Sequence, residues 1–100
     1  MNRYRLSYTP GVRHIVDNLP GNIRQRVKRT IHTLLEDPYP AEAEPMRDDF
    51  QQLWRIQIDA WRIVYFVDEE VLIVEIVRVG RKSGSDRGPS FYEGLRPPRL

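Results

Sequence analysis

Arginines at predicted strand positions are the side chains of this sequence that are best suited to binding or catalysis. Arg62 stands in an alternating segment, on the same side as Val64 and Phe66. A guanidinium among apolar neighbours is costly unless its head reaches water, a carboxylate or a ligand. One interpretation is an ion pair with a local acid such as Asp59 or Glu75. The other is a bound anion.

Further polar and basic side chains accompany Arg62 in the predicted sheet. They are Arg55 and Gln57 on the preceding strand, and Arg78, Arg81 and Lys82 at the end of the following one. Adjacent antiparallel strands bring such residues within reach of one another, which predicts a positive patch on one sheet face. Because guanidinium groups can hold two phosphate oxygens at once, we interpret this patch as a phosphate site.

The sequence contains few residues or motifs that are typical of other kinds of functional site. The chain has no cysteine, which excludes disulfides, thiolate catalysis and Cys-based metal centres. His14 and His32 fall on different predicted helices, so no metal or other cofactor is expected. The sequence contains no P-loop, G-x-G-x-x-G or G-x-S-x-G motif. It also has no run of about 20 apolar residues, which predicts a cytoplasmic protein without a membrane partner.

Charge is unevenly distributed along the chain, although the formal net charge is only +2. Residues 1–32 carry seven basic residues and one acid, whereas residues 33–50 carry one basic residue and six acids. Residues 51–75 remain acidic, with two basic residues and five acids, and residues 76–100 return to six basic residues and two acids. Basic surfaces attract polyanions, so this pattern weakly favours nucleic acid over an ordinary solvated surface.

Hydrophobic periodicity predicts the elements that position these residues. In chain order they are a strand at 3–8, helices at 10–19 and 20–36, and strands at 53–58, 61–67 and 71–79. Thr9 as N-cap and Pro10 at the first helical position predict where the first helix begins. The acidic stretch 37–49 is expected to be a loop.

The element order β-α-α-β-β-β predicts an α+β fold in one domain. A helical hairpin packs on one face of an antiparallel sheet of about four strands, and the last strand, apolar on nearly every residue, is central or covered on both faces. Residues 1–82 form the domain, and 83–100, with Gly, Pro and Ser, form a C-terminal loop and tail. The expected helical core positions are Val12, Ile15, Val16, Leu19, Ile23, Val27, Ile31 and Leu34, with Ile56, Ile63 and Val74 in the same core.

Several short motifs occur together in a distinctive order. They are L-L-x-D-P at 34–38, L-W-R-I at 53–56, W-R-I-V-Y at 61–65 and V-x-V-G-R at 77–81. With the strand Tyr4-x-Leu6 and the helical hairpin, they resemble the RelE/ParE superfamily of bacterial type II toxins over residues 3–82. The resemblance implies a RelE-like fold and a cognate antitoxin partner that wraps the toxin.

The two branches of the superfamily imply two activities. RelE-like toxins cut mRNA in the ribosomal A site without a metal, and ParE-like toxins poison DNA gyrase. In RelE-like cleavage the 2′-hydroxyl attacks the adjacent phosphate, which requires a base, cations for the phosphorane and a proton donor for the leaving oxygen. The resemblance therefore implies mRNA and the ribosome as partners, or gyrase as the alternative.

The resemblance also assigns roles to individual residues. Arg62 matches the arginine that contacts the scissile phosphate, and Arg55 matches the first basic residue of the preceding strand. Arg81 and Lys82 follow the V-x-V-G turn, where the family has a second phosphate-binding basic residue. Together with the predicted positive patch, this gives an expected catalytic set of Arg62, Arg81, Lys82 and Tyr92, in which Tyr92 stacks on a base. The expected RNA-binding residues are Arg55, Gln57 and Arg78.

The sequence departs from the family at two places. Gln57 stands where RelE-like ribonucleases place a basic residue proposed as the general base, and an amide cannot accept that proton. Residues 83–90 separate the basic pair from Phe91-Tyr92. We therefore rank three hypotheses: an mRNA interferase first, a gyrase-inhibiting toxin second, and a catalytically silent module that binds nucleic acid or antitoxin third.

Overall fold

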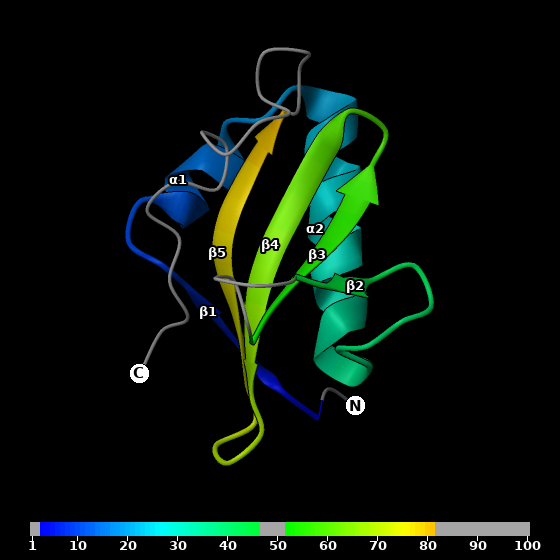
Figure 1. The fold of residues 1–100 in the computed structure, drawn as a ribbon. Helices are drawn as coiled ribbons and strands as arrows, with labels where there is room; N and C mark the ends of the chain where they lie inside the picture. Colours follow the sequence, from blue (N-terminus) through cyan, green and yellow to red (C-terminus); the bar gives the residue numbers. More distant parts are fainter. Residues whose placement is uncertain (1–2, 47–51, 82–100) are drawn as a thin grey trace.

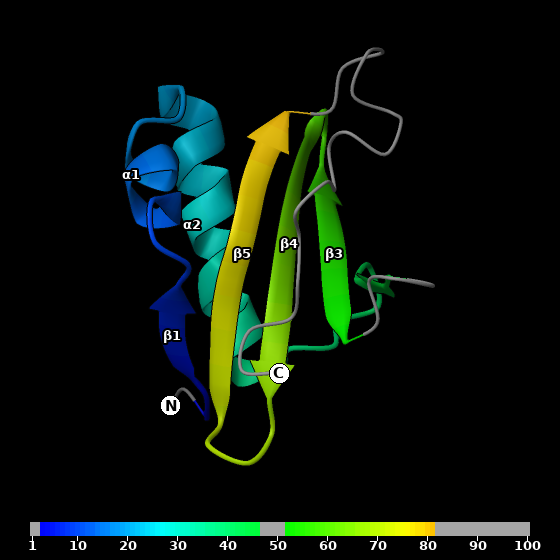
Figure 2. The ribbon, with the colours of Figure 1, turned by 60° about the vertical axis from the view of Figure 1, so that its left-hand side comes forward.

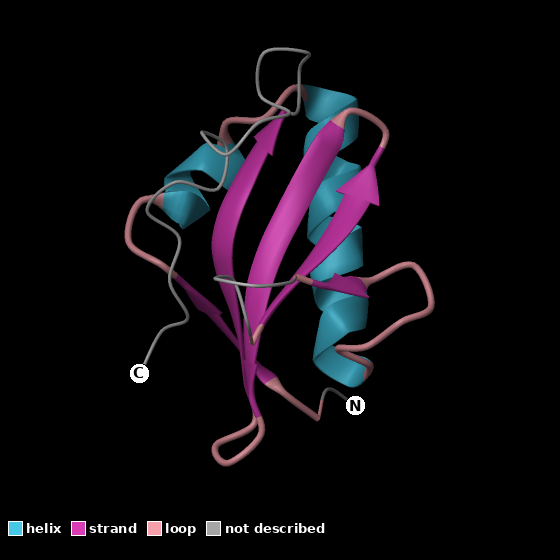
Figure 3. Ribbon diagram, in the orientation of Figure 1, coloured by secondary structure: helices cyan, strands magenta, loops and turns pink. Residues whose placement is uncertain are grey.

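The computed structural model describes residues 3–46 and 52–81. These residues contain two helices and five strands (Figures 1 and 3). In chain order they are β1 (Arg5–Tyr8), α1 (Val12–Asp17), α2 (Gly21–Glu36), β2 (Glu44–Pro45), β3 (Leu53–Ile58), β4 (Trp61–Asp68) and β5 (Ile73–Arg81). The predicted α+β class is confirmed. The predicted tail at 83–100 lies outside the described residues.

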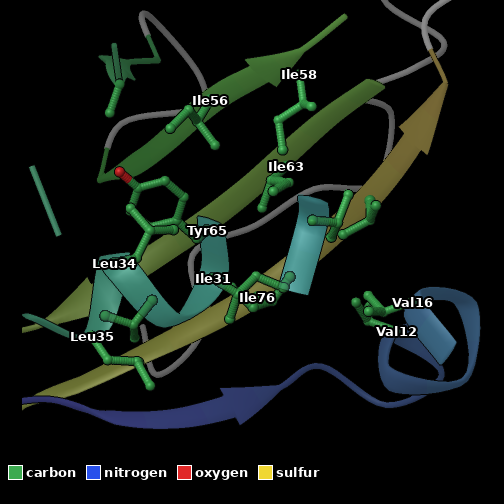
Figure 4. Packing of buried hydrophobic residues seen from close by; sticks show 14 of the residues in the cluster. Val12, Val16, Ile31, Leu34, Leu35, Ile56, Ile58, Ile63, Tyr65 and Ile76 are labelled. Atoms are coloured by element: carbon green, nitrogen blue, oxygen red, sulfur yellow. The ribbon is translucent and has the colours of Figure 1, made fainter. Parts of the chain in front are cut away.

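Both helices cover the same face of the sheet, as Figure 2 shows. On α2 the apolar residues recur every three or four positions, which gathers them on one stripe. Val27 and Ile31 on this stripe are almost fully buried, and they belong to one core with Ile56, Ile63 and Val74 of the sheet. Figure 4 shows Ile31 of α2 close to Ile56 and Ile63 in this core. The predicted core is therefore confirmed at these positions.

The first helix is shorter than predicted and begins later. Gly11 precedes it with φ of 88°, a left-handed backbone that glycine adopts without steric cost, and the helix starts at Val12. Thr9 does not cap the helix, because its hydroxyl donates a hydrogen bond of 2.9 Å to Oε2 of Glu75 on β5. Ile15 was expected in the core but is 45% exposed, since this six-residue helix buries only Val12 and Val16.

The sheet is mixed, with strand order β1-β5-β4-β3-β2, and it differs in two respects from the predicted antiparallel sheet of about four strands. First, β1 pairs in parallel with β5, because the chain crosses over both helices before it returns to the sheet. Second, the stretch expected to be a loop contains β2, which pairs antiparallel with β3. This strand has only two residues, which is too short for a periodic pattern, and one of them is a proline.

The last strand begins two residues later than predicted. The Asp68 carboxylate accepts hydrogen bonds from the backbone N–H groups of Glu70 and Val71, which closes a turn, and Leu72 then takes a positive φ of 57°. Val71 is consequently 47% exposed. From Ile73 onward β5 lies between β1 and β4, which confirms that this apolar strand is internal to the sheet.

A carboxylate in the same turn ties distant segments together. The hydroxyl of Tyr4 donates a hydrogen bond of 2.7 Å to Oε1 of Glu69, and the hydroxyl of Tyr39 donates to Oε2. These bonds lower the pKa of Glu69, the one from Tyr39 contributing most. The N-terminal segment and the loop after α2 are thus both anchored to the β4–β5 turn.

Candidate functional site

The sheet has a second face, opposite the helices, which we call the far face. Its apolar part is a small cluster that is separate from the main core and consists of Met46, Leu53, Val64, Phe66 and Val77. Side chains alternate between the two faces of a strand, so Arg55 and Gln57 share the far face with Leu53, and Arg62 shares it with Val64. The predicted grouping of these residues on one face is therefore observed.

Arg62 lies at the centre of the polar part of the far face. Gln57 of β3 is directly opposite it on one side, and Gly80 of β5 is directly opposite it on the other. Arg55 and Arg78 both pair with Val64, two residues further along β4, which makes them diagonal neighbours of Arg62 at about 7–8 Å. Three arginines thus occupy neighbouring positions on the far face.

Arg62 is only half exposed, and its Nε atom is buried. The glycine opposite it places no side chain beside the guanidinium stem. A cation that is held partly out of water interacts more strongly with an anion than a fully solvated one, because screening is weaker. The position is thus suited to a phosphate group.

A β-bulge brings Arg78 to this face. Val64 pairs with Arg78 but the next residue, Tyr65, pairs with Ile76, so Val77 is an extra residue in β5. Strict alternation would place Arg78 on the helix side together with Val74 and Ile76, which belong to the main core. The extra residue reverses the alternation, and Arg78 joins Val64 on the far face.

Acidic residues line one side of the arginine group. Nη2 of Arg55 lies 3.1 Å from Oε2 of Glu44, which is its direct partner on β2. Glu42, Glu44, Arg55, Ile56, Gln57 and Arg62 together line a hollow of ≈ 110 Å³. The amide of Gln57 donates a hydrogen bond of 2.8 Å to the backbone carbonyl of Asp59. Sequence patterns missed Glu44 because the strand that carries it has only two residues.

Arg81 is not part of the far-face group. It pairs with Trp61, whose neighbour Arg62 points the opposite way, so alternation puts Arg81 on the helix side at the end of the sheet. There it lines a second hollow near the start of α2. Lys82 and Tyr92 lie outside the described residues, so the structure does not place them.

Some kinds of site find no support in the described residues. No group of three or more His, Asp or Glu side chains among residues 3–46 and 52–81 is arranged to hold a metal ion. His14 and His32 are exposed. No helix in this part of the chain is long and apolar enough to cross a membrane.

Solved structures of bacterial and archaeal toxins share this fold. The RelBE2 toxin–antitoxin complex from Mycobacterium tuberculosis contains a chain that is 24% identical, with a TM-score of 0.70, covering 82% of this chain and 94% of that one. The isolated E. coli RelE toxin is 22% identical, with a TM-score of 0.71 and coverages of 90% and 93%. A YoeB/ParE toxin from Agrobacterium tumefaciens is 15% identical, with a TM-score of 0.70 and coverages of 79% and 99%.

The sequence itself matches a toxin family. No curated protein is similar enough to count as a match. Residues 6–85, however, match the ParE toxin of the type II toxin–antitoxin system parDE. This match spans most of the chain and includes every described strand and helix from α1 to β5. The chain therefore belongs to the ParE toxin family, within the RelE/ParE superfamily of type II toxins.

Proposed function

We propose that this toxin is a metal-independent endoribonuclease that cuts mRNA on the ribosome, and that the far face binds the scissile phosphate. In this reaction the 2′-oxygen bonds to phosphorus and the bond to the 5′-oxygen breaks, which leaves a 2′,3′-cyclic phosphate. One proton leaves the 2′-hydroxyl and one reaches the 5′-oxygen. The phosphorane carries extra negative charge, which fixed cations stabilise.

The observation that carries the proposal is the position of Arg62 among its neighbours. Arg55 and Arg78 flank it diagonally, and Gly80 leaves room beside it. A guanidinium can contact two phosphate oxygens at once, and the two diagonal arginines supply further charge. Messenger RNA and the ribosome are cytoplasmic, so we place the action of the toxin in the cytoplasm.

Glu44 is the side chain that we assign as the base. Gln57 cannot accept a proton, whereas the Glu44 carboxylate lines the same hollow as Arg62. Its ion pair with Arg55 holds the carboxylate at the edge of the arginine group. Glu44 therefore offers a proton acceptor on β2, in place of the basic residue that the family has on β3.

Inhibition of DNA gyrase is the second candidate. Two observations favour it: the matched family is named for ParE, and Gln57 stands at the usual position of the base. A gyrase inhibitor needs a complementary surface rather than a catalytic set.

The experiment that separates the two candidates uses purified toxin and the variant Arg62→Ala. Primer extension on ribosome-bound mRNA is set beside a gyrase supercoiling assay. We expect cleavage by the parent chain, a loss of ~100- to 1000-fold in Arg62→Ala, and partial rescue in Arg62→Lys. Arg29→Ala is the control, because this arginine is exposed on α2 and lines neither the hollow that contains Arg62 nor the groove beside β1. Cleavage and toxicity that survive in folded Arg62→Ala would refute the assigned site.

A cognate antitoxin is the protein partner that we propose. The RelBE2 structure, which contains a chain of similar fold, is a toxin–antitoxin complex. In this toxin, β1 is an edge strand. The N–H groups of Arg5 and Thr9 donate to the carbonyls of Leu72, just before β5, and Ile76 in β5, so the backbone groups of Leu6 and Tyr8 point outward. A free edge of this kind can accept an added strand.

The groove beside β1 indicates which chemistry the added antitoxin strand would have. It has a volume of ≈ 620 Å³, and Arg13, Lys28 and His32 line it together with Asp17. Basic residues also dominate the first 32 positions, which favours an acidic segment with apolar anchors. Co-expression with a small adjacent gene should rescue growth, and Leu6→Pro should weaken capture while mRNA cleavage persists. A chain that is harmless when induced alone would count against the toxin assignment.

A further inference from the structure

The hollow that contains Arg81 lies at the end of the sheet where α2 begins, away from the far face. Its volume is ≈ 320 Å³, within the usual size range of small-ligand sites. The lining comes from three parts of the chain: the start of α2 with Arg26, the β3–β4 turn with Asp59, and the paired strand ends with Trp61 and Arg81. We call it the Trp61 hollow.

Trp61 gives this hollow a rigid aromatic surface. Its side chain is half buried and packs against the main core, so the ring is held in place while part of it stays accessible. Arg81 is directly opposite Trp61 in the β4–β5 pairing, and it is exposed. An indole ring next to a guanidinium is a pair of groups that suits a nucleobase and the phosphate attached to it.

The charges around the hollow are mixed but net positive. Arg26 forms an ion pair with Asp59, which fixes both side chains at the rim. Arg81 adds a second cation, and the first turn of α2 contains no acidic residue. Two arginines against one carboxylate leave the hollow attractive to an anion.

We infer that the Trp61 hollow binds one nucleotide of single-stranded RNA, with the base on Trp61 and a phosphate on Arg81. This inference rests on the proposed function, because it extends the RNA path away from the scissile phosphate. The Trp61–Arg81 pair is the rung of the sheet next to the Arg62–Gly80 pair, about 3.4 Å further along the strands. A strand held at Arg62 therefore reaches the hollow by passing over the sheet end.

Tryptophan fluorescence provides a direct test, because the chain has two tryptophans and Trp54→Phe leaves Trp61 as the only one. The probe is an RNA pentanucleotide with 2′-O-methyl groups, which cannot be cleaved. We expect it to quench Trp61, and an oligoglutamate of equal charge to leave the emission unchanged. Trp61→Leu should weaken RNA binding by roughly 5- to 150-fold, whereas Trp61→Phe keeps most of the affinity.

Arg81→Ala supplies a second, independent measurement. It should lower affinity and reduce the slope of log K against log salt by about one, as expected when one phosphate contact is lost. Arg29→Ala is the matched control, because this arginine is exposed on α2 and lines neither the Trp61 hollow nor the groove beside β1. It should leave both quantities unchanged. If Trp61→Leu does not fold, the salt slope of Arg81→Ala decides the question.

The outcomes separate this inference from the proposed function. If Trp61→Leu and Arg81→Ala bind the pentanucleotide like the parent chain while Arg62→Ala loses affinity, the inference is wrong and the proposed function stands. If the oligoglutamate quenches Trp61 as RNA does, the hollow is a peptide site and the inference is also wrong. If the parent chain does not bind the pentanucleotide but cuts ribosome-bound mRNA, the inference is wrong and the proposed function stands. If it does neither, both are overturned.

Discussion

Gly80 lies directly opposite Arg62 in the antiparallel pairing of β4 with β5, so the central arginine of the far face has no side chain across from it on that strand. The Cβ atoms of directly paired residues are about 4.5–5.5 Å apart. Any larger residue at position 80 would therefore stand beside the stem of Arg62. The glycine leaves the space beside the stem of Arg62 open, and in the proposed function a phosphate approaches Arg62 there.

Replacing Gly80 with valine should lower mRNA cleavage by about 10-fold or more, which is about 1.4 kcal/mol of transition-state stabilisation. Gly80 does not have a positive φ, so its backbone accepts a side chain, and valine favours strands more than glycine does. The free energy of unfolding should therefore not fall. Single-turnover cleavage and urea unfolding measure the two effects. Gly80→Ala should give an intermediate rate, and a valine variant with the parent rate would contradict the prediction.

Glu44→Gln should separate catalysis from binding. The substitution removes the assigned base and also a negative charge beside Arg55, so kcat should fall by roughly 100-fold or more while KM does not rise. Arg55→Ala should raise KM, because it removes a cation from the phosphate site. Steady-state kinetics on ribosome-bound mRNA measure both. If Glu44→Gln keeps the parent kcat, Glu44 is not the base.

Ile31 and Ile15 form a matched pair for the core. Ile31 is 1% exposed, whereas Ile15 is 45% exposed on α1. Ile31→Ala should therefore lower the free energy of unfolding by ~2–5 kcal/mol, and Ile15→Ala by less than about 1 kcal/mol. Urea denaturation of the two variants measures the difference. Equal losses would contradict the assigned burial of α2.

The parts of the fold that follow a simple period could be predicted from the sequence. The stripe on α2 has helical spacing, and the alternation on β3 and β4 assigned Arg55, Gln57 and Arg62 to one face, as observed. Each of these assignments depends only on neighbours in the chain. The order of the elements along the chain follows from the same periodic segments and from the turn residues between them.

The parts that could not be predicted depend on contacts between distant segments. Arg78 reaches the far face through a bulge at Val77, and a bulge interrupts the period on which the prediction relied. Arg81 was grouped with Arg62, although strict alternation from Trp61 separates them. The parallel pairing of β1 with β5 and the role of Glu44 both follow from the path of the chain across the sheet, which carries no local signal.

The cluster of Glu69 with Tyr4 and Tyr39 predicts how stability depends on acid. Hydrogen bonds from Tyr39 and Tyr4 lower the pKa of Glu69 in the folded chain. A carboxyl group with a lowered folded pKa contributes stability above its unfolded value of about 4.3, and that contribution is lost as the pH falls through the folded pKa. The free energy of unfolding should therefore decrease on acidification below about pH 5.

Glu69→Gln tests this dependence, because glutamine keeps the shape of the side chain but cannot titrate. Urea unfolding of parent and variant is measured between neutral and acidic pH. The variant should be less stable than the parent near neutral pH, and the difference should shrink as the solution becomes more acidic, since protonation removes the same interaction from the parent. Glu70→Gln is the control: its side chain is exposed in the same turn and does not contact the two tyrosines, so it should follow the parent curve. A gap between parent and Glu69→Gln that stays constant at every pH would show that the cluster acts through packing rather than through the charge of Glu69.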